Sequence, residues 1–147
     1  MGVEARSDIT NVAFILEGSG AYRDPQTILQ DAGRSGDIVA QTLMAYNPTS
    51  KKWVPFTDET ATDGTQFPRG ILLDTITEAA IVAGDVEAPI LVRGEIVDKT
   101  GLVIENSKTL DTIINEPLNL NTSVQDFLAM VGILVEATID IDEFENA

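Results

Sequence analysis

Carboxylates are the most numerous side chains in this sequence that could take part in catalysis or bind a ligand. The 147 residues include 24 Asp and Glu against 9 Lys and Arg, with no His and no Cys. Without Cys there is no disulfide or thiol nucleophile, and without His there is no Ser-His-Asp triad and no ordinary neutral-pH base. A pair of carboxyl groups flanking a cleft, as in a glycosidase, is the main catalytic option that remains. No spacing marks such a pair, and an aromatic content of 5% is low for a sugar-binding platform, so we expect no enzyme activity.

Three short stretches could hold a metal ion or a phosphate, and each has a simpler structural interpretation. Asp58 and Asp63 lie near Gly64, but their spacing fits no calcium loop and Asp-Gly is a common turn dipeptide. Residues 18–20 read Gly-Ser-Gly, without the third glycine or the Lys-Ser/Thr of a phosphate loop. Residues 136–147 carry five acids and no base. A solvated tail is favoured there over a metal or partner site, because a calcium loop needs a glycine that the segment lacks. We expect no metal and no cofactor.

The charge of the chain bears on its partners. The net charge is −15, and Lys51-Lys52 is the only adjacent basic pair. A nucleic-acid binder needs a basic surface that displaces counterions, and an anionic membrane also repels an acidic protein. No apolar run approaches the length of a membrane-spanning helix, and the N-terminal residues lack the pattern of a signal peptide. We therefore expect a soluble, unexported protein with no nucleic-acid partner and no membrane partner.

The elements that must position any site begin with an N-terminal arm. Residues 9–16 are rich in β-branched and aromatic types, which predicts a strand. Residues 18–37 contain four glycines and a proline before Asp37, which predicts a loop or linker. A loop of this length is uncommon inside a compact domain. The sequence therefore divides into residues 1–36, an arm and linker, and residues 37–147, a β domain with an acidic C-terminal tail.

The body of the chain reads as mostly β structure. Residues 37–47 predict a strand with Ile38, Ala40, Thr42 and Met44 on one face, and the polar turn after Asn47 leads into a second extended segment, which together predict a hairpin. The apolar segments 71–84 and 88–97 favour two further strands.

One clear helix precedes the last strand. Residues 121–132 place Val124, Phe127, Leu128 and Val131 on one apolar stripe, with a capping-box pattern before them and Gly132 after them. The capping box pairs Thr122 with Gln125, and residues 133–141 predict a final strand. The balance is that of a small, mainly β domain, a barrel or a sandwich, with one or two short helices.

Trp53 is the single tryptophan of the chain. Two interpretations compete, because a lone Trp anchors either a core or a binding interface. Tyr46 and Phe56 lie close to it in sequence and could extend a rigid contact surface. Core packing is the favoured interpretation, with Trp53 kept as a candidate interface anchor.

The order of these stretches resembles the head decoration proteins of tailed bacteriophages, the capsid-stabilising proteins of the phage lambda type. No single motif is specific, but the order and the spacing are characteristic over about residues 36–136. The matching stretches are a Gly-led strand, a hairpin ending in Trp-Val-Pro, "ATDGT" followed by a proline, "GIL", "DVEA", "VRGE", and a final helix with its strand: residues 36–40, 53–55, 61–65, 68, 70–72, 85–88, 92–95 and 122–135.

The resemblance implies a structural protein that is not an enzyme. Members of that family have a small β-barrel-like fold and form homotrimers on the outer surface of the expanded capsid, where they hold the head together after DNA packaging. Their N-terminal segment pairs with a strand of the major capsid protein. Here that capsid-binding role would fall to the arm before Gly36, with Ile9, Val12, Phe14 and Ile15 as its apolar side chains, and the protein would be located on the virion.

Two other functions stay open at this point. One is an acidic β-domain adaptor or ligand-binding module unrelated to capsids. The other is a carboxylate-dependent hydrolase, which the sequence favours least.

Strand addition at a sheet edge needs main-chain hydrogen bonds more than particular side chains, so the sequence does not fix the capsid partner.

Overall fold

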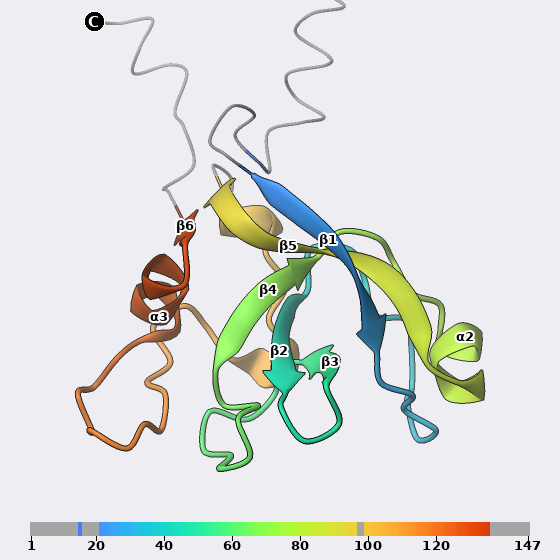
Figure 1. Cartoon of the computed structure of the whole chain (residues 1–147), viewed down its shortest axis with the longest axis horizontal. Helices are drawn as coiled ribbons and strands as arrows, with labels where there is room; N and C mark the ends of the chain where they lie inside the picture. The colour runs from blue at the N-terminus through green and yellow to red at the C-terminus, as the bar shows by residue number, and fades with distance from the viewer. Residues whose placement is uncertain (1–14, 16–20, 97–98, 136–147) are drawn as a thin grey trace, which may run out of the picture.

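A computed structural model describes Ile15 and residues 21–96 and 99–135 of the chain. In these residues the chain forms a strongly curved β-sheet with two short α-helices (Figure 1). The strands are β1 (Tyr22–Ile28), β2 (Leu43–Asn47), β3 (Lys52–Pro55), β4 (Pro68–Leu72), β5 (Val86–Ile96) and β6 (Ile133–Val135). The helices are α2 (Glu78–Ala83) and α3 (Val124–Met130), with 3-10 turns η1 (Lys99–Gly101) and η2 (Glu105–Ser107).

Five of the strands close into a barrel. The strand order is β1-β3-β2-β4-β5-β6, and an additional pairing between β1 and β5 closes the first five strands on themselves. The β1–β5 ladder is antiparallel, the β1–β3 contact is parallel, and β6 adds to β5 as a parallel sixth strand. The prediction of a small, mainly β barrel with one or two short helices is confirmed.

Side chains that alternate along the strands build two cores. Met44, Leu72 and Ile90 belong to a cluster that takes a buried residue from each of the five barrel strands, and this cluster is the barrel interior. Their sequence neighbours on the same strands, Leu43, Ala45, Ile71 and Leu91, belong to a second cluster. This cluster lies between the barrel, α3 and β6 and also contains Leu128 and Ile133. Because the central strands are covered on both faces, their sequences read as continuous apolar runs instead of alternating ones.

The hairpin and Trp53 agree with the sequence. β2 pairs with β3 in an antiparallel ladder, and the turn between them is held by Asn47, whose side-chain oxygen accepts from the backbone N–H groups of Thr49 and Ser50 at 2.9 and 3.2 Å. Trp53 is 6% exposed and lies in the barrel interior. Its indole N–H donates to the Gln26 side-chain oxygen at 3.1 Å. Core packing of Trp53 is therefore confirmed.

β1 corrects one prediction. Residues 18–37 were expected to form a loop or linker, and that prediction is wrong for Tyr22–Ile28, which pair with β5 along their whole length. The strand contains Pro25, which lies opposite Pro89. Proline lacks an N–H group, so it is tolerated only where no ladder bond is needed. The barrel therefore begins at Tyr22, well before residue 37.

Two other boundaries differ from the sequence prediction. β2 begins at Leu43 because Gln41 has a positive φ of 74° that interrupts an extended chain; Ile38 forms only an isolated bridge with Ile76. The segment 71–84 is not one strand: β4 ends at Leu72, and α2 begins after Thr77, whose hydroxyl accepts from Ala80 N–H. The predicted last strand is present at Ile133–Val135, and the rest of its predicted range, residues 136–141, lies outside the described residues.

α3 is the predicted helix with a different cap. Ser123, not Thr122, is the N-cap, and its hydroxyl accepts from the Asp126 N–H at 3.1 Å. The Thr122 hydroxyl is engaged elsewhere, since it donates to the Glu116 carboxylate at 2.8 Å. Gly132 ends the helix with a positive φ of 98°, as the sequence predicted.

Candidate functional site

The arm residues singled out by the sequence fall mostly outside the described structure. Ile9, Val12 and Phe14 lie outside the described residues, whereas Ile15 is described. Ile15 forms an antiparallel bridge with Ile96, the last residue of β5, and packs against the second cluster, between the barrel, α3 and β6, which we call the outer core. The chain segment before the barrel is therefore anchored, at this residue, to the end of β5.

Two glycines let three chain segments meet beside that anchor. Gly94 of β5 has a φ of +150°, and a Cβ built there would lie 3.2 Å from both Cα and Cβ of Ala21. Its N–H donates to the Gly132 carbonyl at 3.0 Å, and β6 pairs with residues 94–96 immediately afterwards. We call this meeting of Ala21, Gly94 and Gly132 the junction.

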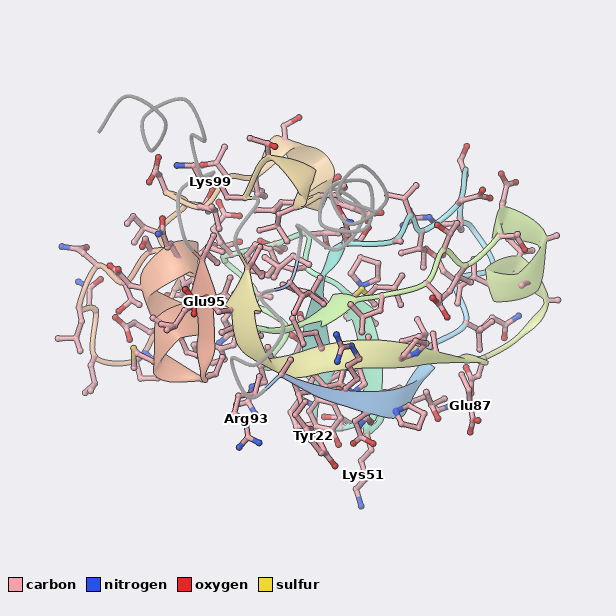
Figure 2. The ribbon with its side chains drawn as sticks, turned by 90° about the horizontal axis from the view of Figure 1, so that it is seen from above. Tyr22, Lys51, Glu87, Arg93, Glu95 and Lys99 are labelled. Atoms are coloured by element: carbon pink, nitrogen blue, oxygen red, sulfur yellow. The ribbon has the colours of Figure 1, made fainter. Side chains whose placement is uncertain are left out.

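The surface around the junction presents apolar side chains and one cation. Tyr22 is 51% exposed, and the Arg93 guanidinium lies 5.8 Å from the centre of its ring. Figure 2 shows both side chains projecting from the same edge of the ribbon. Met130, the last residue of α3, and Leu134, the middle residue of β6, are 72% and 47% exposed. Exposed aromatic, Arg and Met side chains of this kind are enriched at protein interfaces.

The edge of β6 is a second element of this surface. Among the described strands, β6 pairs only with β5. An edge strand presents main-chain N–H and C=O groups to which another chain can add. β1 begins, and β5 and β6 end, at the same end of the molecule (Figure 1). The chain therefore enters and leaves the described fold at the same end.

A substitution at the junction has a definite expected cost. Gly94→Ala places a methyl group against the Ala21 backbone and forces a residue with a Cβ into a positive φ, so we expect a loss of about 1–3 kcal/mol in the free energy of unfolding. Gly84→Ala is the matched control, because its Cβ would meet nothing within 4 Å; its effect should stay within about 0.5 kcal/mol. Urea unfolding of the two variants measures the difference, and equal stabilities would show that the junction is not tightly packed.

The mouth of the barrel forms a separate concavity. A cavity of about 440 Å³ is lined by one residue from each barrel strand and one from the end of α3: Gln26, Tyr46, Trp53, Arg69, Val92 and Val131. Tyr46 and Trp53 meet edge-to-face with ring centres 5.5 Å apart. Trp53 thus reaches the floor of this mouth while its ring stays buried.

The carboxylates that the sequence singled out stabilise turns. Asp58 accepts from the N–H and hydroxyl of Thr60, and Asp63 accepts from the same groups of Thr65, at 2.6 to 3.0 Å. These hydrogen bonds hold the pKa of both carboxyls below the usual value. In the described part of the chain no group of three or more Asp and Glu is arranged to hold a metal ion. The turn interpretation of Asp58 and Asp63 is confirmed; Asp140, Asp142 and Glu143 lie outside the described residues.

These turns predict a response to acid. A lowered folded-state pKa contributes stability that is complete above the unfolded pKa of about 4 and is lost as the pH falls through the folded value. We therefore expect the midpoint temperature of thermal unfolding to decrease as the pH is lowered below about 4. The measurement is made in high salt so that the net charge is screened. Asp63→Asn keeps the acceptor oxygen without the titrating group, so this variant should lose less stability on acidification than the parent. An identical pH profile would contradict a role for the Asp63 carboxylate.

Sequence reasoning missed the junction. Its one local signal was Gly94, which stands inside the strand pattern of residues 88–97, a position that often marks a close approach of two backbones. Gly132 was interpreted only as the end of the helix. Ala21 and Tyr22 were missed because they fall in the segment taken for a linker.

Comparisons with known proteins leave the family open. No protein-family model matches the chain, and no curated protein matches it. Within the described residues, no helix is long and apolar enough to cross a membrane.

Proposed function

We propose that the chain is a structural virion protein, a head decoration protein of a tailed bacteriophage. In this proposal it binds the outer surface of the expanded capsid as a homotrimer, contacts the major capsid protein and stabilises the head after DNA packaging. It has no catalytic role. The observation that carries the proposal is the packing of the resemblance motifs into one unit.

The motif stretches, far apart in sequence, contact one another in the barrel. Gly70 of the "GIL" stretch has no room for a side chain, because a Cβ there would lie 2.9 Å from the Trp53 ring and 2.5 Å from Ile90. Gly64 of "ATDGT" packs against Pro48 of the hairpin turn, because a Cβ built on Gly64 would lie 2.7 Å from the Pro48 ring. Gly70 and Trp53, from two of the motif stretches, are therefore constrained together, as are Gly64 and the hairpin turn, which gives the spacing of these motifs a physical reason in this fold.

The bridge between Ile15 and Ile96 supports the proposed arm. Ile15 already pairs with β5, so the residues before it start from an anchored position at one end of the sheet. The proposed arm is residues 1–14, with Ile9, Val12 and Phe14 as the side chains that contact the capsid. Strand addition would supply the main-chain hydrogen bonds. Each site would be modest in affinity because the arm loses entropy on docking, and three arms in one trimer would raise the total through avidity.

The charge of the chain is compatible with this location. A net charge of −15 gives the protein no attraction to packaged DNA, so an outer position costs nothing electrostatically. The protein would be made in the host cytoplasm and assembled onto preformed heads.

Binding to heads tests the proposal. Sedimentation should give the mass of three 15.8-kDa chains, and the trimer should co-sediment with expanded heads of the encoding phage and not with unexpanded ones. A chain beginning at Ile15 is the matched variant: it should keep the fold and lose most binding to expanded heads. A monomer that ignores both kinds of head would overturn the proposal.

One observation favours the alternative ligand-binding module. The barrel-mouth cavity has a volume typical of small-molecule sites, with aromatic and polar groups converging on it. Under this alternative, a small ligand would quench Trp53 fluorescence and raise the unfolding temperature. Arg69→Ala would then abolish both effects without changing the stability of the free protein.

A further inference from the structure

A groove that borders the outer core has no partner in the described structure. Its volume is about 610 Å³, and it is lined by residues that follow β5 and by the first turn of α3. Its lining combines aliphatic, polar and charged side chains, among them Lys99, Leu102, Val103, Lys108, Asp111 and Gln125. We propose that this groove binds the chain's own C-terminal segment, residues 136–147, through its aliphatic and carboxylate side chains.

The position at which the described chain ends carries the proposal. The Gln125 side chain lines the groove, and its amide N–H donates to the carbonyl of Val135 at 3.2 Å. The C-terminal segment therefore starts beside the groove. Twelve residues at about 3.3 Å each can reach roughly 40 Å, so length does not restrict the docking.

The chemistry of the segment complements that of the groove. Residues 138–143 read Thr-Ile-Asp-Ile-Asp-Glu, so in an extended chain Ile139 and Ile141 share one face while Asp140 and Asp142 share the other. The groove offers aliphatic side chains to the first face and a lysine ammonium group to the second.

The charges already in the groove leave one lysine for this role. Lys108 lies 2.7 Å from a Glu59 carboxylate oxygen, and Asp111 also lines the groove. Lys99 forms no ion pair with another described residue and is exposed. Figure 2 shows Lys99 at the outer surface, beside the turn that it begins. Lys99 is therefore the cation expected to contact Asp140 or Asp142.

The test compares the full chain with a chain that ends at Val135, at a protein concentration low enough for the monomer. The acylation rate of each lysine by an amine reagent is measured by mass spectrometry. A segment docked about nine-tenths of the time slows acylation of Lys99 about tenfold in the full chain, and truncation removes the protection. Lys51, on the hairpin turn, is the internal control and should react equally in both chains.

Two additions separate the occupants. A synthetic peptide of residues 136–147 should restore protection of Lys99 in the truncated chain, and a peptide with Ile139→Ser and Ile141→Ser should not. Equal Lys99 reactivity in the full and truncated chains overturns the proposal. Protection that develops only at concentrations where the chain oligomerises also overturns it, because the groove would then be covered by a second copy. The outcome is independent of capsid binding, so it can fail while the proposed function stands.

Discussion

A chain that begins at Ile15 is expected to fold as the intact protein does, whereas a chain that begins at Asp37 is expected not to fold. The second truncation removes β1, which pairs with β5 along seven residues and closes the barrel against β3. It also removes Ile28, which is fully buried, and exposes the interior around Trp53. The expected loss is comparable with the whole stability of a domain this size, about 5–15 kcal/mol.

Near-ultraviolet circular dichroism and urea unfolding measure this difference. The chain from Ile15 should keep the Trp53 signal and unfold cooperatively, and the chain from Asp37 should show neither property. A cooperative, native-like transition in the shorter chain would mean that β1 is dispensable and that the arm extends to residue 36, as the sequence alone suggested. The two truncations also separate loss of capsid binding from loss of fold.

Trp53→Ala is expected to lower the free energy of unfolding by about 3–5 kcal/mol. The ring is 6% exposed, meets Tyr46 edge-to-face and occupies the space that Gly70 leaves open. Its removal leaves a cavity in the barrel interior and deprives Gln26 of a hydrogen-bond donor. Trp53→Phe is the matched control: it retains an aromatic ring, loses the indole N–H, and should cost less.

Urea unfolding followed by circular dichroism measures both variants. A near-neutral Trp53→Ala would contradict the packing described here and would return Trp53 to the role of an interface anchor. Gly70→Ala should also be destabilising, because its methyl group would overlap Ile90 and the Trp53 ring. In the Trp53→Ala background its added cost should shrink, since one of the two overlaps is gone.

The parts of the fold that were predictable from sequence are those with local signals. The hairpin was visible because Asn47-Pro48 marks a turn between two extended runs, and α3 because its apolar residues recur at helical spacing. Trp53 was favoured for the core on composition alone. The cap of α3 was misplaced by one residue because Thr122 bonds to Glu116, which no local pattern indicates.

The parts that were not predictable depend on distant partners. β1 contains Arg23, Asp24 and Pro25, a composition typical of a loop, and it becomes a strand only because β5 offers a matching edge 58 to 71 residues later. Pro89, opposite Pro25, precedes the pairing of β5 with β4 at Ile90 and Leu91, so neither proline removes a bond that the barrel needs. The junction was missed for the same reason, since Ala21 and Gly94 meet only in the folded chain.

The thermal release of DNA from filled heads tests the central claim most directly. Heads of the encoding phage, assembled without this protein, are heated with and without the purified chain, and DNA release is followed with an intercalating dye. The account predicts that the full chain raises the release temperature, and that a chain beginning at Ile15 does not, although it is folded. Release at the same temperature with and without the full chain would contradict the claim that this protein stabilises the capsid.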